Sequence, residues 1–148
     1  MTMRSLFTAR EWETLQFAPL WIFVMVAGAD RKLEKDEVAA LARELGEAHL
    51  YRNDLAREVF GSVAKAFPQV WPAFQADPRD VMVGLLDVVA ALRKIDASEA
   101  EGFKRALIYL GSKIAEAGGG KGLFRKKDPK KGRAALIVAC AILEVQLL

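Results

Sequence analysis

The 148-residue chain contains one cysteine and one histidine, and their scarcity excludes several classes of protein. A single cysteine, Cys140, forms no internal disulfide, so the chain is not a disulfide-stabilised secreted domain and suits a reducing compartment. One histidine leaves little of the chemistry that hydrolases and zinc enzymes use. A chain of about 150 residues buries roughly two thirds of its unfolded surface in one core without such aids. We expect one domain over residues 1–148 and no enzymatic activity.

Long apolar runs are also missing. The run Phe17–Ala29 contains Pro19, and the run Ala134–Leu148 is interrupted by Glu144 and Gln146. Both are shorter than the about 20 apolar residues that a membrane span needs. The N-terminus lacks the basic and then apolar order of a secretory signal. We therefore expect a cytoplasmic protein.

Positive charge is concentrated in residues 121–133, which we call the basic segment. It holds seven basic residues and one acid, a net charge of +6. Because the whole chain carries +3, the remainder carries −3, so the generally cationic body of many nucleic-acid-binding proteins is not indicated. The basic residues are Lys121, Arg125, Lys126, Lys127, Lys130, Lys131 and Arg133.

Side chains that can cap helices mark several helix starts. Thr8 with Glu11, and Asp96 with Glu99, have the spacing of a capping box, in which two side chains satisfy free backbone N–H groups. Asn53 is a weaker start of the same kind. Between the starts, apolar residues recur at helical spacing, and no alternating strand pattern occurs. The sequence predicts an all-α fold.

Two Asp-Pro pairs, Asp77-Pro78 and Asp128-Pro129, place proline at the first helical position, where its missing N–H costs nothing. Pro19 either starts a new helix or kinks a continuous one, because it removes a backbone donor. About seven helices follow, with a short turn near 69–75. They cover residues 9–18, 19–29, 34–48, 54–66, 78–92, 97–116 and 129–147.

The chain contains an internal repeat. A shift of 62 residues lays Phe23–Leu45 onto Leu85–Leu107 without a gap, and seven of the 23 positions are identical. Each copy has an apolar helix, a basic turn, an acidic cap and an amphipathic helix. This order predicts two helical hairpins related by a pseudo-twofold axis, at about 19–66 and 78–116, before a C-terminal helix at about 129–147.

The segment Ala29–Glu37 reads Ala-Asp-Arg-Lys-Leu-Glu-Lys-Asp-Glu and resembles the Ala-Asp-Gly-x-Ile-Asp-x-x-Glu signature of tellurite-resistance TerB-like proteins. Ala91–Glu99 looks like a degraded second copy, and Gly118–Phe124 is similar to the glycine-rich loop before the last helix of that family. The resemblance runs from about Pro19 to the C-terminus. It implies a duplicated all-α domain, a binding or stress-response role, and acids associated with divalent metal.

The TerB-like resemblance implies a set of candidate metal ligands from both copies. Carboxylates suit hard cations such as Ca²⁺, Mg²⁺ and Mn²⁺. The alternative is helix capping, which typically contributes about 0.5 to 2 kcal/mol per cap. Arg31, Lys32 and Lys35 stand among the acids and would oppose a metal ion. The candidate ligands are Asp30, Glu34, Glu37, Asp96 and Glu99.

The basic segment is the second candidate site, because it joins positive charge to the apolar pair Leu123-Phe124. We expect it to bind an anionic membrane surface or a protein partner, at roughly 1 kcal/mol per cation near lipid headgroups. Nucleic acid is disfavoured, a solvated loop is the simplest alternative, and a second copy of the chain is a further candidate partner. The binding residues are Lys121, Leu123, Phe124, Arg125, Lys126, Lys127, Lys130, Lys131 and Arg133.

Two acids lie in apolar runs, Asp87 and Glu144. If buried, each must be paired or hydrogen-bonded, because an isolated interior carboxylate is too costly to keep ionised. An enzyme built on this chain would need a pocket that joins one of them to other polar groups. We expect both on the outer faces of their helices.

Overall fold

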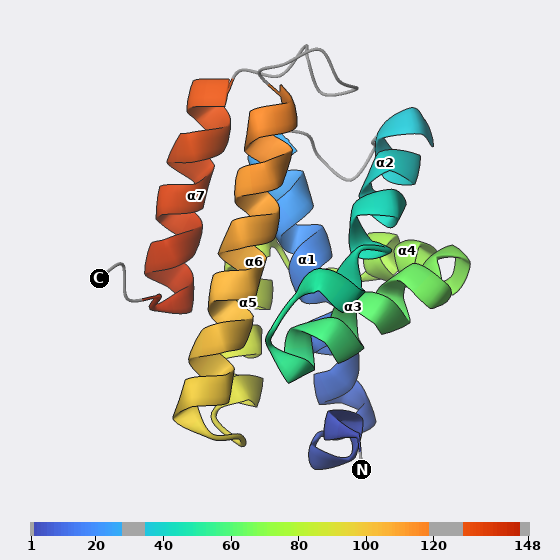
Figure 1. Cartoon of the computed structure of the whole chain (residues 1–148), viewed down its shortest axis with the longest axis vertical. Helices are drawn as coiled ribbons and strands as arrows, with labels where there is room; N and C mark the ends of the chain where they lie inside the picture. The colour runs from blue at the N-terminus through green and yellow to red at the C-terminus, as the bar shows by residue number, and fades with distance from the viewer. Residues whose placement is uncertain (1, 28–34, 119–128, 146–148) are drawn as a thin grey trace.

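The computed structural model describes residues 2–27, 35–118 and 129–145 (Figure 1). These residues form helices and their connections and contain no strand, which confirms the all-α prediction. Two short 3-10 helices, η1 and η2, accompany seven α-helices. The elements are η1 (Met3–Leu6), α1 (Ala9–Ala27), α2 (Lys35–Leu45), η2 (Ala48–Leu50), α3 (Asp54–Lys65), α4 (Phe67–Ala76), α5 (Val81–Leu92), α6 (Ala97–Gly118) and α7 (Pro129–Leu143).

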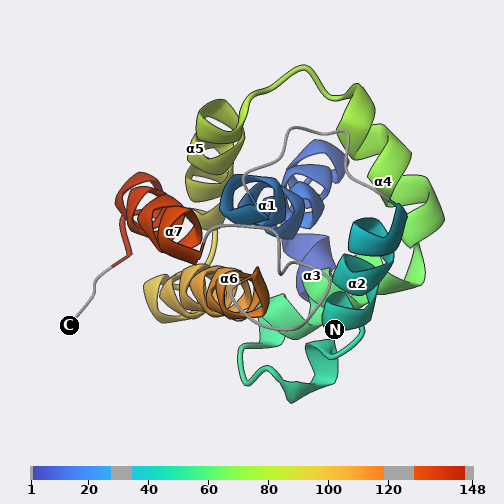
Figure 2. The ribbon, with the colours of Figure 1, turned by 90° about the horizontal axis from the view of Figure 1, so that it is seen from above.

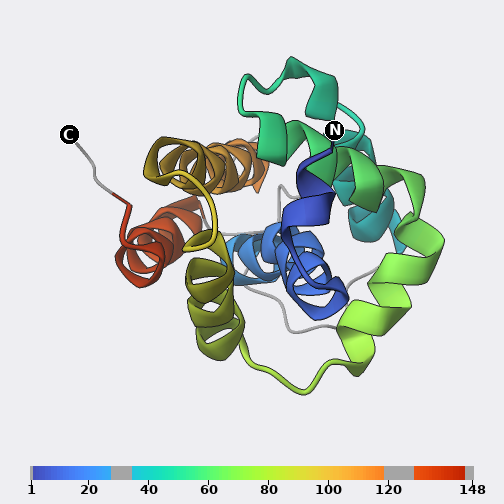
Figure 3. The same ribbon diagram turned by 90° about the horizontal axis from the view of Figure 1, so that it is seen from below.

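Helix α1 is the central element of the fold. Seen from above and from below, α5, α6 and α7 lie on one side of it, and α2, α3 and α4 lie on the other (Figures 2 and 3). It contacts α3, α4, α5, α6 and α7. Phe17, Trp21 and Phe23 of α1 are among the largest fully buried side chains. A helix with apolar residues on all sides must be enclosed by others, which explains this position.

Two proline-containing stretches are more helical than predicted. Helix α1 continues through Pro19 as one helix instead of two. Residues 67–76 form the full helix α4 where only a short turn was expected. Pro68 lies in the first turn of α4, where a missing N–H costs nothing, and the buried Val70 and Phe74 anchor the helix.

Helix α7 ends four residues earlier than predicted, at Leu143. Glu144 has a left-handed backbone with φ of 60°. The N–H of Val145 donates to the carbonyl of Cys140 at 3.0 Å, and the N–H of Glu144 donates to that of Ala141 at 3.3 Å. This is the Schellman arrangement, which satisfies the last carbonyls and turns the chain away from the helix axis.

Most predicted helix starts are correct. The N–H of Thr8 donates to Glu11 Oε1 at 2.8 Å, and the N–H of Glu11 donates to Thr8 Oγ1 at 3.1 Å, so this capping box is confirmed. Asn53 caps α3 as predicted. The predicted start behind Asp77 is wrong. Asp80 caps α5, which begins at Val81, because the Asp77 carboxylate is bound to Arg79.

The helix termini gather at two ends of the molecule. The end of α1, the start of α2, the end of α6 and the start of α7 lie at one end, whereas α6 starts at the other (Figure 1). At about 1.5 Å per residue, the 22 residues of α6 span about 33 Å between these ends. The internal repeat stays a prediction, since α2 has 11 residues where α6 has 22.

The described parts of the two apolar runs form much of α1 and α7. Cys140 of α7 is buried, and burial raises the pKa of its thiol. Among the residues that the structure describes, no helix is both long and apolar enough to cross a membrane.

Candidate functional site

The two second-copy acids hold helix starts. Asp96 Oδ2 accepts from the N–H groups of Ser98 at 3.0 Å and Glu99 at 3.4 Å, as a cap of α6. Glu99 does not turn back to its own helix. Its Oε1 accepts from the N–H of Leu55 at 3.0 Å and so satisfies a free donor in the first turn of α3. Both carboxylates thus make the hydrogen bonds that the capping interpretation requires.

The start of α3 is bound to the start of α6 by a second pair of contacts. Asn53 Oδ1 accepts from the N–H of Ala56 at 2.8 Å, and Asn53 Nδ2 donates to the carbonyl of Glu99 at 3.1 Å. The approach is close, because a Cβ on Gly102 would lie 2.4 Å from Asn53 Nδ2. Asn53 and Glu99 together join the two helix starts.

The structure does not bring the second-copy acids together with Glu37. Glu37 lies in the first turn of α2, at the end of the molecule opposite to the start of α6 (Figure 1). Asp30 and Glu34 lie outside the described residues, as does the side chain of Glu37. Within the described part of the chain, no three His, Cys, Asp or Glu residues are placed to hold a metal ion. Metal binding by the first copy stays a prediction.

Replacing Glu99 with alanine is expected to lower the free energy of unfolding by about 1 to 2 kcal/mol, because the Leu55 N–H loses its acceptor. Ser98→Ala is the matched control, since the Ser98 side chain is exposed and its hydrogen bond to Asp96 is made by the backbone N–H, and it should change stability little. Urea unfolding with and without Ca²⁺, Mg²⁺ or Mn²⁺ checks the role. A cation that stabilises the wild type but not Glu99→Ala would contradict pure capping.

Most of the basic segment lies outside the described residues, but its end does not. Arg133 is exposed near the start of α7, and Lys130 and Lys131 precede it in the same helix. Gly132 lets α7 approach closely, since a Cβ there would lie 3.1 Å from that of Ala115 in α6. The segment is therefore flanked by helices that pack on each other. Lys121, Leu123, Phe124, Arg125, Lys126 and Lys127 lie outside the described residues.

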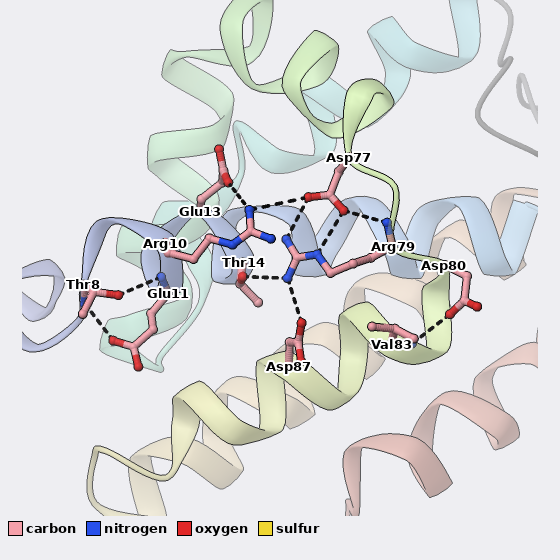
Figure 4. Close-up of polar contacts among 10 residues, drawn as sticks. All are labelled: Thr8, Arg10, Glu11, Glu13, Thr14, Asp77, Arg79, Asp80, Val83 and Asp87. Carbon is pink, nitrogen blue, oxygen red and sulfur yellow. Dashed lines mark hydrogen bonds and ion pairs between the residues drawn. The ribbon is translucent and has the colours of Figure 1, made fainter.

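An ion-pair cluster around Arg79, not predicted from the sequence, joins three elements (Figure 4). The Arg79 guanidinium donates hydrogen bonds to Asp77 Oδ2 at 2.9 Å, to Asp87 Oδ2 at 3.0 Å and to Thr14 Oγ1 at 3.0 Å. The Asp77 side chain is 4% exposed and that of Arg79 is 10% exposed. Arg79 Cζ also lies 5.0 Å from the centre of the Trp21 ring. The cluster therefore ties the α4–α5 connection to α1 and α5.

Electrostatics keep the Asp77 carboxylate ionised. Hydrogen bonds from Arg79 hold its pKa below the ordinary value of 3.8, and burial only partly opposes them. Arg10 adds an ion pair at 3.9 Å (Figure 4). Arg10 and Arg79 thus supply the counter-charges of the buried Asp77 carboxylate within the cluster. The only sequence signal was Asp87 within an apolar run. Its side chain is 50% exposed and paired with Arg79.

The other unusual acid, Glu144, lines a hollow of about 430 Å³ between α5, α6 and α7. Arg93, Glu101 and Lys104 contribute the other charges, over apolar side chains such as Leu92. No serine, threonine, cysteine or histidine is among the described residues that line it. The lining offers charges of both signs and apolar contact, without a nucleophile from these residue types.

The chain is similar to an archaeal protein. It is 34% identical over 117 residues to the uncharacterised protein ORF11′ of Methanothermobacter thermautotrophicus. The alignment covers 78% of this chain and 79% of the archaeal protein. No family model matches the chain, and no solved structure matches it.

Proposed function

This chain belongs to the same family as protein ORF11′ of Methanothermobacter thermautotrophicus, and we propose that it is a non-enzymatic binding module that docks on an anionic membrane surface through its basic segment. The observation that carries the proposal is the separation of charge. Residues 121–133 carry +6 and the rest of the chain −3. Cations near lipid headgroups contribute roughly 1 kcal/mol each, while the acidic remainder is repelled, so one end would face the membrane.

Several cations outside the basic segment are held in ion pairs. Lys94 pairs with Glu11 at 2.6 Å, Lys113 pairs with Glu44 at 3.0 Å, and Arg79 is bound within its cluster. Arg133 is exposed and has no ion-pair partner among the described residues. Leu123 and Phe124 of the basic segment would add a small apolar insertion at the headgroups.

The TerB-like resemblance adds a stress-response role of the tellurite-resistance type and a divalent cation at Asp30, Glu34 and Glu37 to the proposal. Calorimetry with Ca²⁺, Mg²⁺ and Mn²⁺ on the wild type and on Glu37→Ala tests the cation. Saturable binding that the variant loses would support the site, and no heat with any ion would reject it. Docking on anionic lipid does not depend on that result.

Charge reversal of Lys126 and Lys127 to glutamate is expected to weaken binding to phosphatidylserine-containing vesicles at least about tenfold, since each lost cation near the headgroups is worth roughly 1 kcal/mol. The control reverses Arg52 and Lys65, which are exposed elsewhere. Both variants then carry a net charge of −1, four units below +3. Co-sedimentation measures binding. Equal losses in the two variants would mean that only net charge matters and would contradict docking through this segment.

A further inference from the structure

The outer face of α7 has no polar side chain for two turns. Ile137 is 69% exposed and Val138 48%, and Ala134 and Ala141 are exposed beside them. From Ala134 to Leu143 the only side chain with a heteroatom is Cys140, which is buried. A surface helix ordinarily carries polar residues on its outer face. This face therefore has the composition of a covered surface.

Helix α5 also carries exposed apolar side chains. It packs against α7 on the same side of α1 (Figure 2). On α5, Met82 is 57% exposed, Val83 45% and Leu86 50%. A group of exposed apolar residues on one helix face marks an interaction site more strongly than scattered ones.

The order of residues along α7 is self-complementary. Ala134, Ile137, Val138 and Ala141 follow the spacing i, i+3, i+4, i+7 and read small, large, large, small. If a second α7 lies antiparallel about a twofold axis between Ile137 and Val138, each Ala134 meets the other copy's Ala141, and each Ile137 meets the other copy's Val138. A twofold interface must match itself in this way.

The charges at the two ends of this apolar face of α7 favour a second copy of the chain as the molecule that covers it. Arg133 lies near the start of α7, and Glu144 follows directly after its last residue, Leu143, so opposite charges stand at the two ends of the helix. Antiparallel pairing puts each one near its opposite charge on the other copy. Neither residue has an ion-pair partner among those described.

Glu144 stands at the negative end of the α7 dipole, where a carboxylate is disfavoured. A guanidinium from another molecule would offset that cost, together with Arg93 and Lys104, which line the same hollow in this copy. We propose that this face binds a second copy of the chain, with the two α7 helices antiparallel and Arg133 of each copy paired with Glu144 of the other. This assembly uses Arg133 of the basic segment and none of its other six cations, and it does not require lipid.

Sedimentation equilibrium tests the proposal through charge exchange. The wild type is expected to reach a mass about twice 16.3 kDa as its concentration rises. Arg133→Glu and Glu144→Arg should each weaken dimerisation at least about tenfold, because each homodimer then holds two like-charge contacts. An equimolar mixture of the two variants should regain the dimer, since all its contacts are again of opposite sign. A mixture that stays monomeric would overturn the pairing.

The apolar contact and the direction have separate tests. Ile137→Glu should raise the dissociation constant at least about tenfold, whereas Leu50→Glu, at a site 67% exposed on η2, should leave it unchanged. Circular dichroism checks that both variants fold. In a Cys140→Ala background, Ala134→Cys mixed with Ala141→Cys should form a mixed disulfide, and Ala134→Cys alone should not cross-link. A monomeric wild type whose vesicle binding falls with Ile137→Glu would assign the face to lipid and reject the dimer.

Discussion

Replacing Arg79 with methionine is expected to lower the free energy of unfolding at pH 7 by about 3 kcal/mol. Methionine keeps the apolar stem but leaves the Asp77 carboxylate, only 4% exposed, without its main partner. Breaking a buried ion pair by removing one member leaves an uncompensated charge, which is among the costliest single changes. The variant also loses the donor to Thr14 and the cation over the Trp21 ring. Urea unfolding measures the difference.

The loss of unfolding free energy in Arg79→Met should depend on pH, and the titration of Asp77 sets the direction of that dependence. In the wild type the pKa of Asp77 is held below 3.8, so its stabilising contribution is present above that pH and is lost as pH falls through the lowered value. In Arg79→Met the buried Asp77 carboxyl is protonated more readily, so acidification lowers the free energy of unfolding of the variant less than that of the wild type. The difference in unfolding free energy between the two proteins should therefore become smaller from pH 7 toward pH 3.

Two further variants separate the buried charge from general disruption. Asp87→Asn removes the half-exposed partner of Arg79 and should cost less than about 1 kcal/mol. Asp77→Asn placed in the Arg79→Met background should recover part of the lost stability, since it removes the unpaired charge. An Arg79→Met protein as stable as the wild type would show that the cluster does not hold α1 to α5.

Replacing Gly84 with alanine should destabilise the protein by about 3 kcal/mol, although the same change in an ordinary helix stabilises it by up to about 1 kcal/mol. A Cβ at Gly84 would lie 2.3 to 2.6 Å from three atoms of the Trp21 indole. Trp21 is fully buried and makes edge contacts with Phe17 and Phe74, so it cannot move aside. Helix α5 would have to shift. Thermal and urea unfolding measure the loss.

For Gly61, a control glycine in α3, we expect no loss of stability on replacement by alanine. A Cβ at Gly61 in α3 would meet only that of Ala48, at an ordinary 3.9 Å, so Gly61→Ala should be neutral or stabilising. Trp21→Phe combined with Gly84→Ala should cost less than the sum of the single changes, because the smaller ring makes room. If Gly84→Ala proves as benign as Gly61→Ala, the close packing of α5 on Trp21 is wrong.

Local signals in the sequence predicted much of the helical framework. The Thr8–Glu11 capping box and the Asn53 cap depend on side chains within three residues of the N–H groups that they satisfy, so spacing alone reveals them. The same logic failed at Asp77, because its carboxylate turns to Arg79 and leaves Asp80 to cap α5. Either Asp77 or Asp80 could have capped this helix, and the contact of Asp77 with Arg79 leaves Asp80 as the cap.

Contacts between distant elements could not be predicted in this way. The acceptors of Arg79 come from α1, the α4–α5 connection and α5, and Glu99 caps a helix 44 positions away. The TerB-like resemblance grouped Glu37, Asp96 and Glu99 in one set of candidate ligands, whereas α2 and α6, at whose starts they lie, begin at opposite ends of the molecule (Figure 1). Similar motifs in one sequence need not be close in space.

The most direct test of docking on anionic lipid is the partition of the wild-type chain between buffer and vesicles as the phosphatidylserine fraction increases from zero. We predict no binding to pure phosphatidylcholine, a steep rise in the partition coefficient with phosphatidylserine, and loss of that rise in high salt, which screens the basic segment. Equal partition into neutral and anionic vesicles, or no binding at any phosphatidylserine fraction, would contradict it.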